Sequence, residues 1–176
     1  VPYGLEKTVS YGTGTSLGPE KILKASRQIE LYDIELGIEP SAILSPKTLE
    51  VKEIPSSHVS ALIKLQNIVK LIVGCKKFPI VIGGEHSITP ACIKPLLEKS
   101  KSLTIVQFDA HADLRDKYQG KKNSHACSMR RCLDNKNLNL ISIGVRSISN
   151  EEYVFYKNNK KRIEIFWAKD ASNWDL

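Results

Sequence analysis

Short apolar runs alternate with stretches of helical periodicity, and this alternation restricts the possible fold more than any other feature of the sequence. A strand that pairs in parallel with an earlier strand needs a long crossover connection, usually a helix. Strands that alternate with helical patterns are therefore typical of βαβ units and a parallel sheet. We predict an α/β protein with one globular domain covering residues 1–176. The predicted strands are residues 78–82, 103–108, 138–144 and 163–167.

The clearest helical pattern covers residues 58–77, where apolar side chains recur every three or four residues and form one stripe. Ser56 or Ser57 can cap the first turn of this helix. The other predicted helices are residues 19–27, 89–99, 124–133 and one capped by Ser149 or Asn150; residues 12–18 form a glycine-rich loop, and residues 29–36 are expected to be extended.

Several features indicate a soluble cytoplasmic protein with no membrane partner. No apolar run approaches the roughly 18 residues that span a bilayer. The first residues, Val1 to Gly4, have neither the basic nor the apolar part of a signal peptide. The four cysteines have no C-x-x-C spacing, which fits reduced thiols better than a disulfide framework. His125 and Cys127 are two candidate zinc ligands, fewer than the four of a structural zinc site.

The net charge of +7 would suit an acidic partner such as a nucleic acid. However, the lysines are scattered among acidic residues, and the short basic runs read as solvated loops and helix ends. The sequence has no long basic stripe with interleaved aromatic residues. We therefore expect no nucleic-acid partner, and strongly salt-dependent association with DNA or RNA would contradict this expectation.

Two clusters of acidic residues and histidines each follow a predicted strand. Residues 83–87, Gly-Gly-Glu-His-Ser, follow the first strand, and residues 109–113, Asp-Ala-His-Ala-Asp, follow the second. Ligands of open parallel sheets gather at the carboxyl ends of the strands, so both clusters point to the same rim. Residues two apart in an extended segment face the same side, so Asp109, His111 and Asp113 can point to one place.

The types of side chain in these clusters suit a divalent metal ion. Carboxylate oxygen and imidazole nitrogen without thiolate fit Mn²⁺, and leave Zn²⁺, Fe²⁺ and Co²⁺ chemically possible. Several carboxylates around one centre can also bridge two metals that bind and activate a water. Taken singly, Asp109 reads as a turn residue and His86 as a hydrogen-bonded histidine. Their coincidence at two strand ends favours a metal site, whose candidate ligands are His86, Asp109, His111 and Asp113.

Two further histidines have less specific surroundings. His125 follows the loop that leaves the second cluster, where its imidazole can reach the site as an acid, a base or a substrate contact. The alternative is an exposed His125 beside a helix-capping Ser124. His58 begins a predicted helix without acidic companions, and we expect it to be a surface or capping residue.

These segments resemble the motifs of the ureohydrolase family, which includes arginases and agmatinases. Residues 83–87 look like the family's G-G-D-H-S motif, residues 109–113 its D-A-H-x-D motif and residues 124–126 its S-H-A motif. Residues 1–3 and 14–25 are similar to its amino-terminal strand, glycine loop and first helix, and residues 143–147 to its I-G-x-R strand. Residues 109–116 and 124–131 look closer to agmatinases than to classical arginases.

The resemblance implies a three-layer α/β/α fold with a mainly parallel sheet, and manganese-dependent hydrolysis of agmatine to putrescine and urea. It implies two Mn²⁺ ions, one bound by His86, Asp109 and Asp113 and the other by Asp109 and His111. A hydroxide between the metals would attack the guanidinium carbon, while His125 would move protons or position the substrate. The family also suggests a homo-oligomer, a trimer or hexamer.

Three departures from the family pattern affect this interpretation. Glu85 replaces the usual aspartate, which we expect to be tolerated because it is not an assigned ligand. Ser16 stands where many members have arginine. The later S-x-D-x-D-x-x-D-P segment, with two more aspartate ligands, is absent from the 176 residues. We therefore expect a partial ureohydrolase domain, incomplete on its C-terminal side, that alone binds metal weakly and leaves a sheet edge uncovered.

Two alternatives remain open. A related hydrolase acting on arginine, guanidinobutyrate, formiminoglutamate or an aminopropylated agmatine would have nearly the same metal centre. A non-catalytic homologue would keep the fold and part of the metal cluster.

Overall fold

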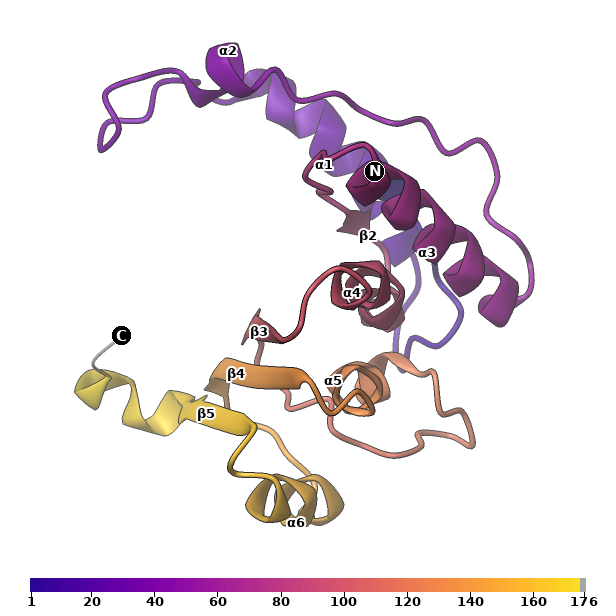
Figure 1. Ribbon diagram of the computed structural model, residues 1–176, viewed down its shortest axis with the longest axis vertical. Helices are drawn as coiled ribbons and strands as arrows, with labels where there is room; N and C mark the ends of the chain where they lie inside the picture. Colours follow the sequence, from indigo (N-terminus) through magenta and orange to yellow (C-terminus); the bar gives the residue numbers. More distant parts are fainter. Residues whose placement is uncertain (175–176) are drawn as a thin grey trace.

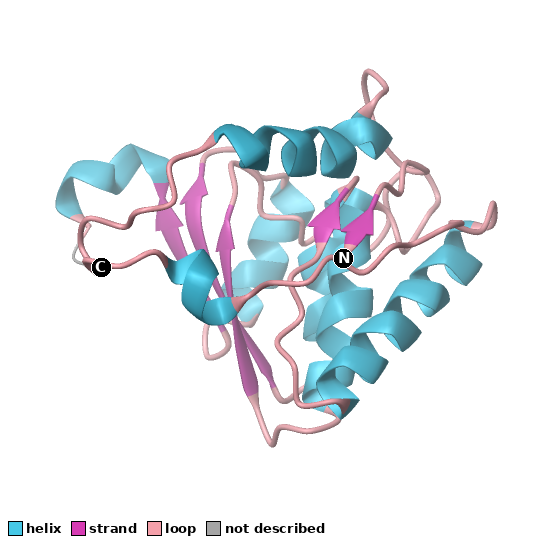
Figure 2. Cartoon of the chain, turned by 90° about the horizontal axis from the view of Figure 1, so that it is seen from above, coloured by secondary structure: helices cyan, strands magenta, loops and turns pink. Residues whose placement is uncertain are grey.

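The computed structural model describes residues 1–174 and contains two parallel sheets with helices packed against them (Figure 1). The smaller sheet pairs β1 (Pro2–Tyr3) with β2 (Ile82–Gly83). The larger has the order β3 (Leu103–Phe108), β4 (Leu138–Val145) and β5 (Ile163–Trp167). Figure 2 shows the two short strands set apart from the three longer ones. The predicted α/β class with parallel strands is confirmed.

The helices connect these strands in the order expected for βαβ units. They are α1 (Gly18–Ala25), α2 (Pro40–Leu44), α3 (His58–Gly74), α4 (Thr89–Leu97), α5 (Ser128–Leu133) and α6 (Asn150–Asn158). Short 3₁₀ turns cover Thr15–Leu17, Ser26–Gln28, His86–Ile88, His125–Cys127 and Ala168–Asn173. The caps of the two best-defined helices agree with the sequence, since Ser57 caps α3 and Ser149 caps α6.

One apolar core lies between the larger sheet and the helices that follow its strands. Alternate β4 residues, Leu138 and Leu140, are buried against α5, and Ile105 of β3 joins the same cluster. The opposite side chains of β3 are exposed, with Val106 at 52% and Phe108 at 77%. The described residues therefore cover one side of β3 with a core and leave the other side open.

A second core lies around the smaller sheet and α3. Leu65 and Val69 of α3 are fully buried with Tyr3 of β1, and each apolar side chain contributes roughly 1.5–3 kcal/mol by burial. The Tyr3 hydroxyl donates a 2.6 Å hydrogen bond to the carbonyl of Ala61. This core fixes β1 beside β2, and thereby sets the position of the residues that follow both strands.

Two predicted elements differ from the structure. Of the predicted strand 78–82 only Ile82 lies in β2, which continues to Gly83, although Ile80 and Ile82 both bond the backbone of Val1. The segment 29–36 was expected to be extended, and Ile29 is, but residues 34–37 form a turn, because the Asp33 carboxylate accepts the backbone N–H groups of residues 35 and 36.

Candidate metal centre

Backbone contacts bring the two acid and histidine clusters to one rim. Residues 83–87 leave β2 through Gly84, whose backbone lies directly against Leu5 after β1. A side chain at Gly84 would place its Cβ 2.6 Å from the Leu5 nitrogen, so this close approach requires glycine. The Leu5 carbonyl then accepts the N–H of Glu85 at 2.8 Å. These contacts aim the next residue, His86, towards the end of β3.

The second cluster is held by the end of β4. The Asp109 N–H bonds the Ile143 carbonyl at 3.1 Å, which continues the parallel ladder past β3. A bulge follows at Gly144, whose φ of 91° favours glycine. The N–H groups of Arg146 and Ser147 both bond the Ala110 carbonyl. The loop that carries Asp109 is therefore fixed by backbone bonds on the neighbouring strand.

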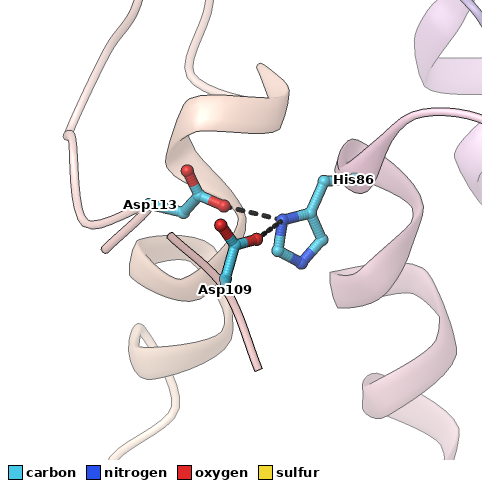
Figure 3. A group of neighbouring side chains, drawn as sticks. All are labelled: His86, Asp109 and Asp113. Carbon is cyan, nitrogen blue, oxygen red and sulfur yellow. Dashed lines mark hydrogen bonds and ion pairs between the residues drawn. The ribbon is translucent and has the colours of Figure 1, made fainter. Parts of the chain in front are cut away.

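Three of the four predicted ligands converge on one point (Figure 3). One ligand atom from each of His86, Asp109 and Asp113 lies within 4.8 Å of the other two. The Nδ1 atom of His86 is 2.6 Å from Asp113 Oδ2 and 3.7 Å from Asp109 Oδ2. Asp113 has a φ of 51°, a conformation that aspartate tolerates better than most residues, and its carbonyl accepts the N–H groups of Met129 and Arg130.

His111 lies on the other side of Asp109. Its Nδ1 atom is 3.3 Å from Asp109 Oδ1, and its side chain is 66% exposed. The chain bends at Ala110, where the Asp109 carboxylate accepts the His111 N–H at 2.8 Å, and this bend breaks the regular alternation expected for residues 109–113. His111 therefore does not join the three converging side chains. Asp109 thus directs one oxygen towards His86 and the other towards His111.

The carboxylates change the proton affinity of His86. Burial alone lowers its pKa, but the hydrogen bond to Asp113 and the charges of Asp113 and Asp109 outweigh burial and raise the pKa. The imidazole nitrogen that faces these carboxylates therefore holds a proton strongly in the metal-free protein. A divalent ion would replace that proton as the positive charge between the three groups.

The donor set fits a divalent metal ion. Two carboxylates and one imidazole, with no thiolate, suit Mn²⁺ and its neighbours among the transition metals. His111 offers a further nitrogen beside the second oxygen of Asp109. The alternative of zinc at His125 and Cys127 has no support here, because the Cys127 thiol is buried and faces the Lys121 carbonyl at 3.8 Å.

His125 opens into the same cavity as three of the candidate ligands. This cavity of about 640 Å³ is lined by His86, His111, Asp113 and His125, and by Tyr118 and Glu152. The ring of His125 packs edge-on against Tyr118, with the ring centres 5.6 Å apart. His125 is thus placed to contact a molecule bound beside the carboxylate cluster.

Sequence reasoning missed the role of Glu85. Its buried carboxylate accepts hydrogen bonds from the backbone of Lys7 and Thr8 and from the hydroxyls of Thr8 and Ser87. Burial raises the pKa of Glu85, but these hydrogen bonds outweigh burial and lower it. The sequence shows an acidic residue at this position of the motif, but two of its three partners, Lys7 and Thr8, lie 78 and 77 residues earlier.

The expectation that His58 is a surface or capping residue is wrong. Its Nε2 atom lies 3.0 Å from the Ser87 hydroxyl, its side chain is mostly buried, and Ser57 provides the cap instead. Burial lowers the pKa of His58 more than nearby Glu85 raises it, with further lowering by Lys121 and Lys7. His58 therefore contacts Ser87 and Glu85, the two residues on either side of His86 in the chain.

Within residues 1–174, no helix is both long and apolar enough to cross a membrane. The four cysteines are unpaired within the described residues, and burial raises the pKa of Cys92 and Cys132 to about 12.

The fold and the cluster together define an α/β protein with a group of carboxylates and a histidine, at the carboxyl edge of its strands, that could hold a metal ion. A family model described as the arginase family matches residues 1–176. The chain belongs to the arginase family.

Individual relatives agree with this assignment. The chain is 37% identical to an N(1)-aminopropylagmatine ureohydrolase of Synechocystis sp., over 99% of the chain and 59% of that protein. It is 34% identical to an agmatinase of Pyrococcus horikoshii, over 93% of the chain and 56% of that protein. The chain therefore spans between half and two thirds of the length of these relatives.

Solved structures match over the same part. The agmatine ureohydrolase of Thermoplasma volcanium superposes with a TM-score of 0.83 at 31% identity, over 97% of this chain and 56% of that chain. The formimidoylglutamase of Bacillus subtilis, at 23% identity, gives a TM-score of 0.82 over 98% of this chain and 56% of that chain, which shows the shared fold alone. The predicted arginase-like fold is confirmed.

Proposed function

We propose that the full-length protein is a metal-dependent ureohydrolase that cleaves a guanidino compound ending in an amine, agmatine or its N(1)-aminopropyl derivative. The observation that carries this proposal is the convergence of His86, Asp109 and Asp113 beside the cavity that contains His125. Membership of the arginase family supports the same reaction class.

His86, Asp109 and Asp113 would hold one metal ion, and Asp109 with His111 would contribute to a second. We propose Mn²⁺ for both positions, in keeping with the donor set. When bound, the metal lowers the pKa of water and thereby supplies a nucleophile at neutral pH.

The chain's own groups then bind and orient the substrate. The Asp113 and Glu152 carboxylates line the cavity, and their negative charge favours a cationic guanidinium group there. Arg115 also lines the cavity, with its Nε atom 3.6 Å from Glu152, so its charge is partly balanced. His125 would hold a substrate nitrogen or transfer a proton to it as the carbon–nitrogen bond breaks.

The choice between the two substrates rests on relatives of each kind. The Synechocystis relative is named for N(1)-aminopropylagmatine, whereas the Pyrococcus relative is named an agmatinase. Both substrates carry the same guanidinium group and differ in the length of the amine tail. The metal cluster therefore fits both, and the residues that contact the tail must distinguish them.

The test is urea release by the Mn²⁺-loaded full-length protein. We expect urea from agmatine or N(1)-aminopropylagmatine, and little or none from arginine or guanidinobutyrate at equal concentration. Activity confined to the carboxylate-bearing substrates would contradict the proposed substrate class. Bound manganese without hydrolysis of any guanidino compound would favour a non-catalytic homologue. The homo-oligomer stays a prediction that sedimentation of the same sample can check.

A further inference from the structure

The segment that follows β1 reaches across the site to His125. Thr8 of this segment is buried, and its hydroxyl oxygen lies 2.8 Å from Glu85 Oε1. The same oxygen lies 3.0 Å from the backbone nitrogen of His125 and 3.3 Å from its ring Nδ1. Thr8 therefore contacts both Glu85, beside the metal ligands, and His125, the predicted catalytic histidine.

The direction of these hydrogen bonds follows from the number of protons. Every partner of Glu85 among Lys7, Thr8 and Ser87 has a proton to give, and a carboxylate can only accept. A threonine hydroxyl has a single proton, which Thr8 donates to Glu85. The Thr8 oxygen is then an acceptor towards His125.

This direction distinguishes the two nitrogens of the His125 ring. The Thr8 oxygen already accepts the backbone N–H of His125, and it can bond Nδ1 only if Nδ1 also carries a proton. An unprotonated Nδ1 would direct its lone pair at a lone pair of Thr8. The hydroxyl of Ser124 lies 3.3 Å from Nδ1. When it donates its proton to Nδ1, it favours an unprotonated Nδ1.

The other ring nitrogen faces the cavity side. Nε2 lies 3.1 Å from the hydroxyl of Ser10, which lies 3.2 Å from the hydroxyl of Tyr118. Both Ser10 and Tyr118 line the cavity beside His125. The Ser10 hydroxyl donates to Tyr118 in this structure, but a hydroxyl can rotate, so Ser10 can give its single proton to an unprotonated Nε2 and accept the Tyr118 proton instead. A substrate N–H group can take the place of Ser10 as the donor to Nε2.

We propose that Thr8 is a positioning residue that holds His125 in the Nδ1–H tautomer, so that the lone pair of Nε2 faces the substrate cavity. Glu85 fixes the direction of the Thr8 hydroxyl, and Thr8 in turn fixes the proton on the histidine. The catalytic meaning of this arrangement rests on the proposed ureohydrolase function, whereas the tautomer itself does not.

The direct test is the ¹⁵N spectrum of the His125 ring in the metal-free full-length protein at alkaline pH. The His125 signals are assigned by their loss in His125→Gln. The ring nitrogens are distinguished by their couplings to the ring protons. We expect a protonated Nδ1 and an unprotonated Nε2 in the wild type and in Thr8→Ser, which keeps the hydroxyl. Thr8→Val has the same shape without a hydroxyl, and we expect it to shift the population towards Nε2–H.

Two results would overturn the proposal. The first is an Nε2–H tautomer in the wild type, a result that needs no folded variant. The second is a Thr8→Val spectrum identical to that of the wild type. Ser124→Ala provides a matched comparison, because we expect loss of this competing hydroxyl to leave Nδ1 protonated. A change to Nε2–H in Ser124→Ala would assign the tautomer to Ser124 instead.

A kinetic measurement on the full-length protein connects the tautomer to the reaction. We expect Thr8→Val to lower kcat by up to about a hundredfold, the lower end of what general acid–base groups contribute, while the affinity for Mn²⁺ stays unchanged. We expect Thr8→Ser to restore most of the lost rate. If the wild type has the Nδ1–H tautomer but releases no urea, the proposed function fails and the positioning role of Thr8 stands.

Discussion

The Nδ1 atom of His86 lies 2.6 Å from Oδ2 of Asp113, although the two residues are 27 positions apart and follow different strands. Burial opposes a charge on this imidazole, and two carboxylates raise its pKa above the ordinary value despite that burial. The metal-free protein therefore places a proton where the proposed metal ion would bind. Proton and metal compete for the same nitrogen.

Substitution of Asp113 tests this site without disturbing the backbone. Asn, like Asp, tolerates the positive φ of 51° at this position, and Asp113→Asn removes only the charge and one ligand oxygen. We expect the Mn²⁺ affinity of the full-length protein to fall at least about tenfold, the smallest loss typical of residues that support a metal. Isothermal titration calorimetry measures this change. Glu164→Gln, at an exposed position of β5, is the control and should bind as the wild type does.

The pH dependence of Mn²⁺ binding follows from the raised pKa of His86. A protonated imidazole cannot bind a metal. The affinity for Mn²⁺ is therefore highest above the pKa of His86 in the folded protein and falls as the pH decreases through that pKa. Because that pKa lies above 6.5, the fall should begin at a higher pH than for an ordinary histidine. Mn²⁺ titrations at a series of pH values measure this fall in affinity. An affinity that stays constant from pH 8 to pH 6, roughly the range in which histidine titrates, would contradict it.

Glu85 should contribute to stability through the four donors that it accepts. We expect Glu85→Gln to lower the free energy of unfolding by about 2 kcal/mol at neutral pH, because one of the two acceptor oxygens becomes an NH2 group that faces buried donors. Burial raises the pKa of this carboxyl, but the hydrogen bonds lower it overall below the ordinary 4.5. The stabilisation is therefore present above pH 4.5 and is lost as the pH falls through the folded pKa.

Urea denaturation of the metal-free chain at several pH values measures this effect. The difference between the wild type and Glu85→Gln should narrow in acid. A difference that stays constant below pH 4.5 would show that the charge of Glu85 is not its cause.

The cap of α6 also supports the loop that carries Asp113. Ser149 and Glu152 form a reciprocal capping box, and Glu152 in addition accepts the buried N–H of Leu114 at 2.9 Å. We expect Ser149→Ala to cost about 1 kcal/mol, as is usual for a lost N-cap, and Glu152→Ala to cost more. Equal costs for the two variants in denaturation experiments would mean that the bond to Leu114 contributes nothing.

The close approach of Gly84 to Leu5 gives a further prediction. Gly84→Ala places a methyl group against the Leu5 backbone, which cannot move without displacing β1, so we expect a loss of about 2 kcal/mol or more. Gly74→Ala, at the end of α3, meets nothing within 4 Å and should be neutral or stabilising by up to about 1 kcal/mol. Similar melting temperatures for the two variants would contradict the proposed contact.

Patterns of neighbouring residues predicted the strands and helix caps of this protein, because these depend mainly on nearby residues. Apolar runs located β3 and β5 to the residue, and the position of Ser149 located the cap of α6. The same reasoning placed His86, Asp109 and Asp113 at one rim, because parallel strands end at a common edge. It placed His111 with them only by assuming an extended loop, but the loop bends at Ala110, where the Asp109 carboxylate accepts the His111 N–H.

Long-range hydrogen bonds were beyond the reach of those patterns. Thr8 and His125 are 117 positions apart, and Thr8 and Glu85 are 77 apart. Nothing in the sequence around Thr8 distinguishes it from other polar residues in a glycine-rich segment. His58 was misassigned for the same reason, since its partner Ser87 is reached only after α3 packs beside the smaller sheet.

Urea release from agmatine and N(1)-aminopropylagmatine by the Mn²⁺-loaded full-length protein, measured beside Asp109→Ala, tests the proposed metal-dependent hydrolysis. Asp109 faces both His86 and His111, so its loss should abolish activity and reduce the bound manganese while the chain stays folded by circular dichroism. Undiminished urea release by Asp109→Ala would contradict the account.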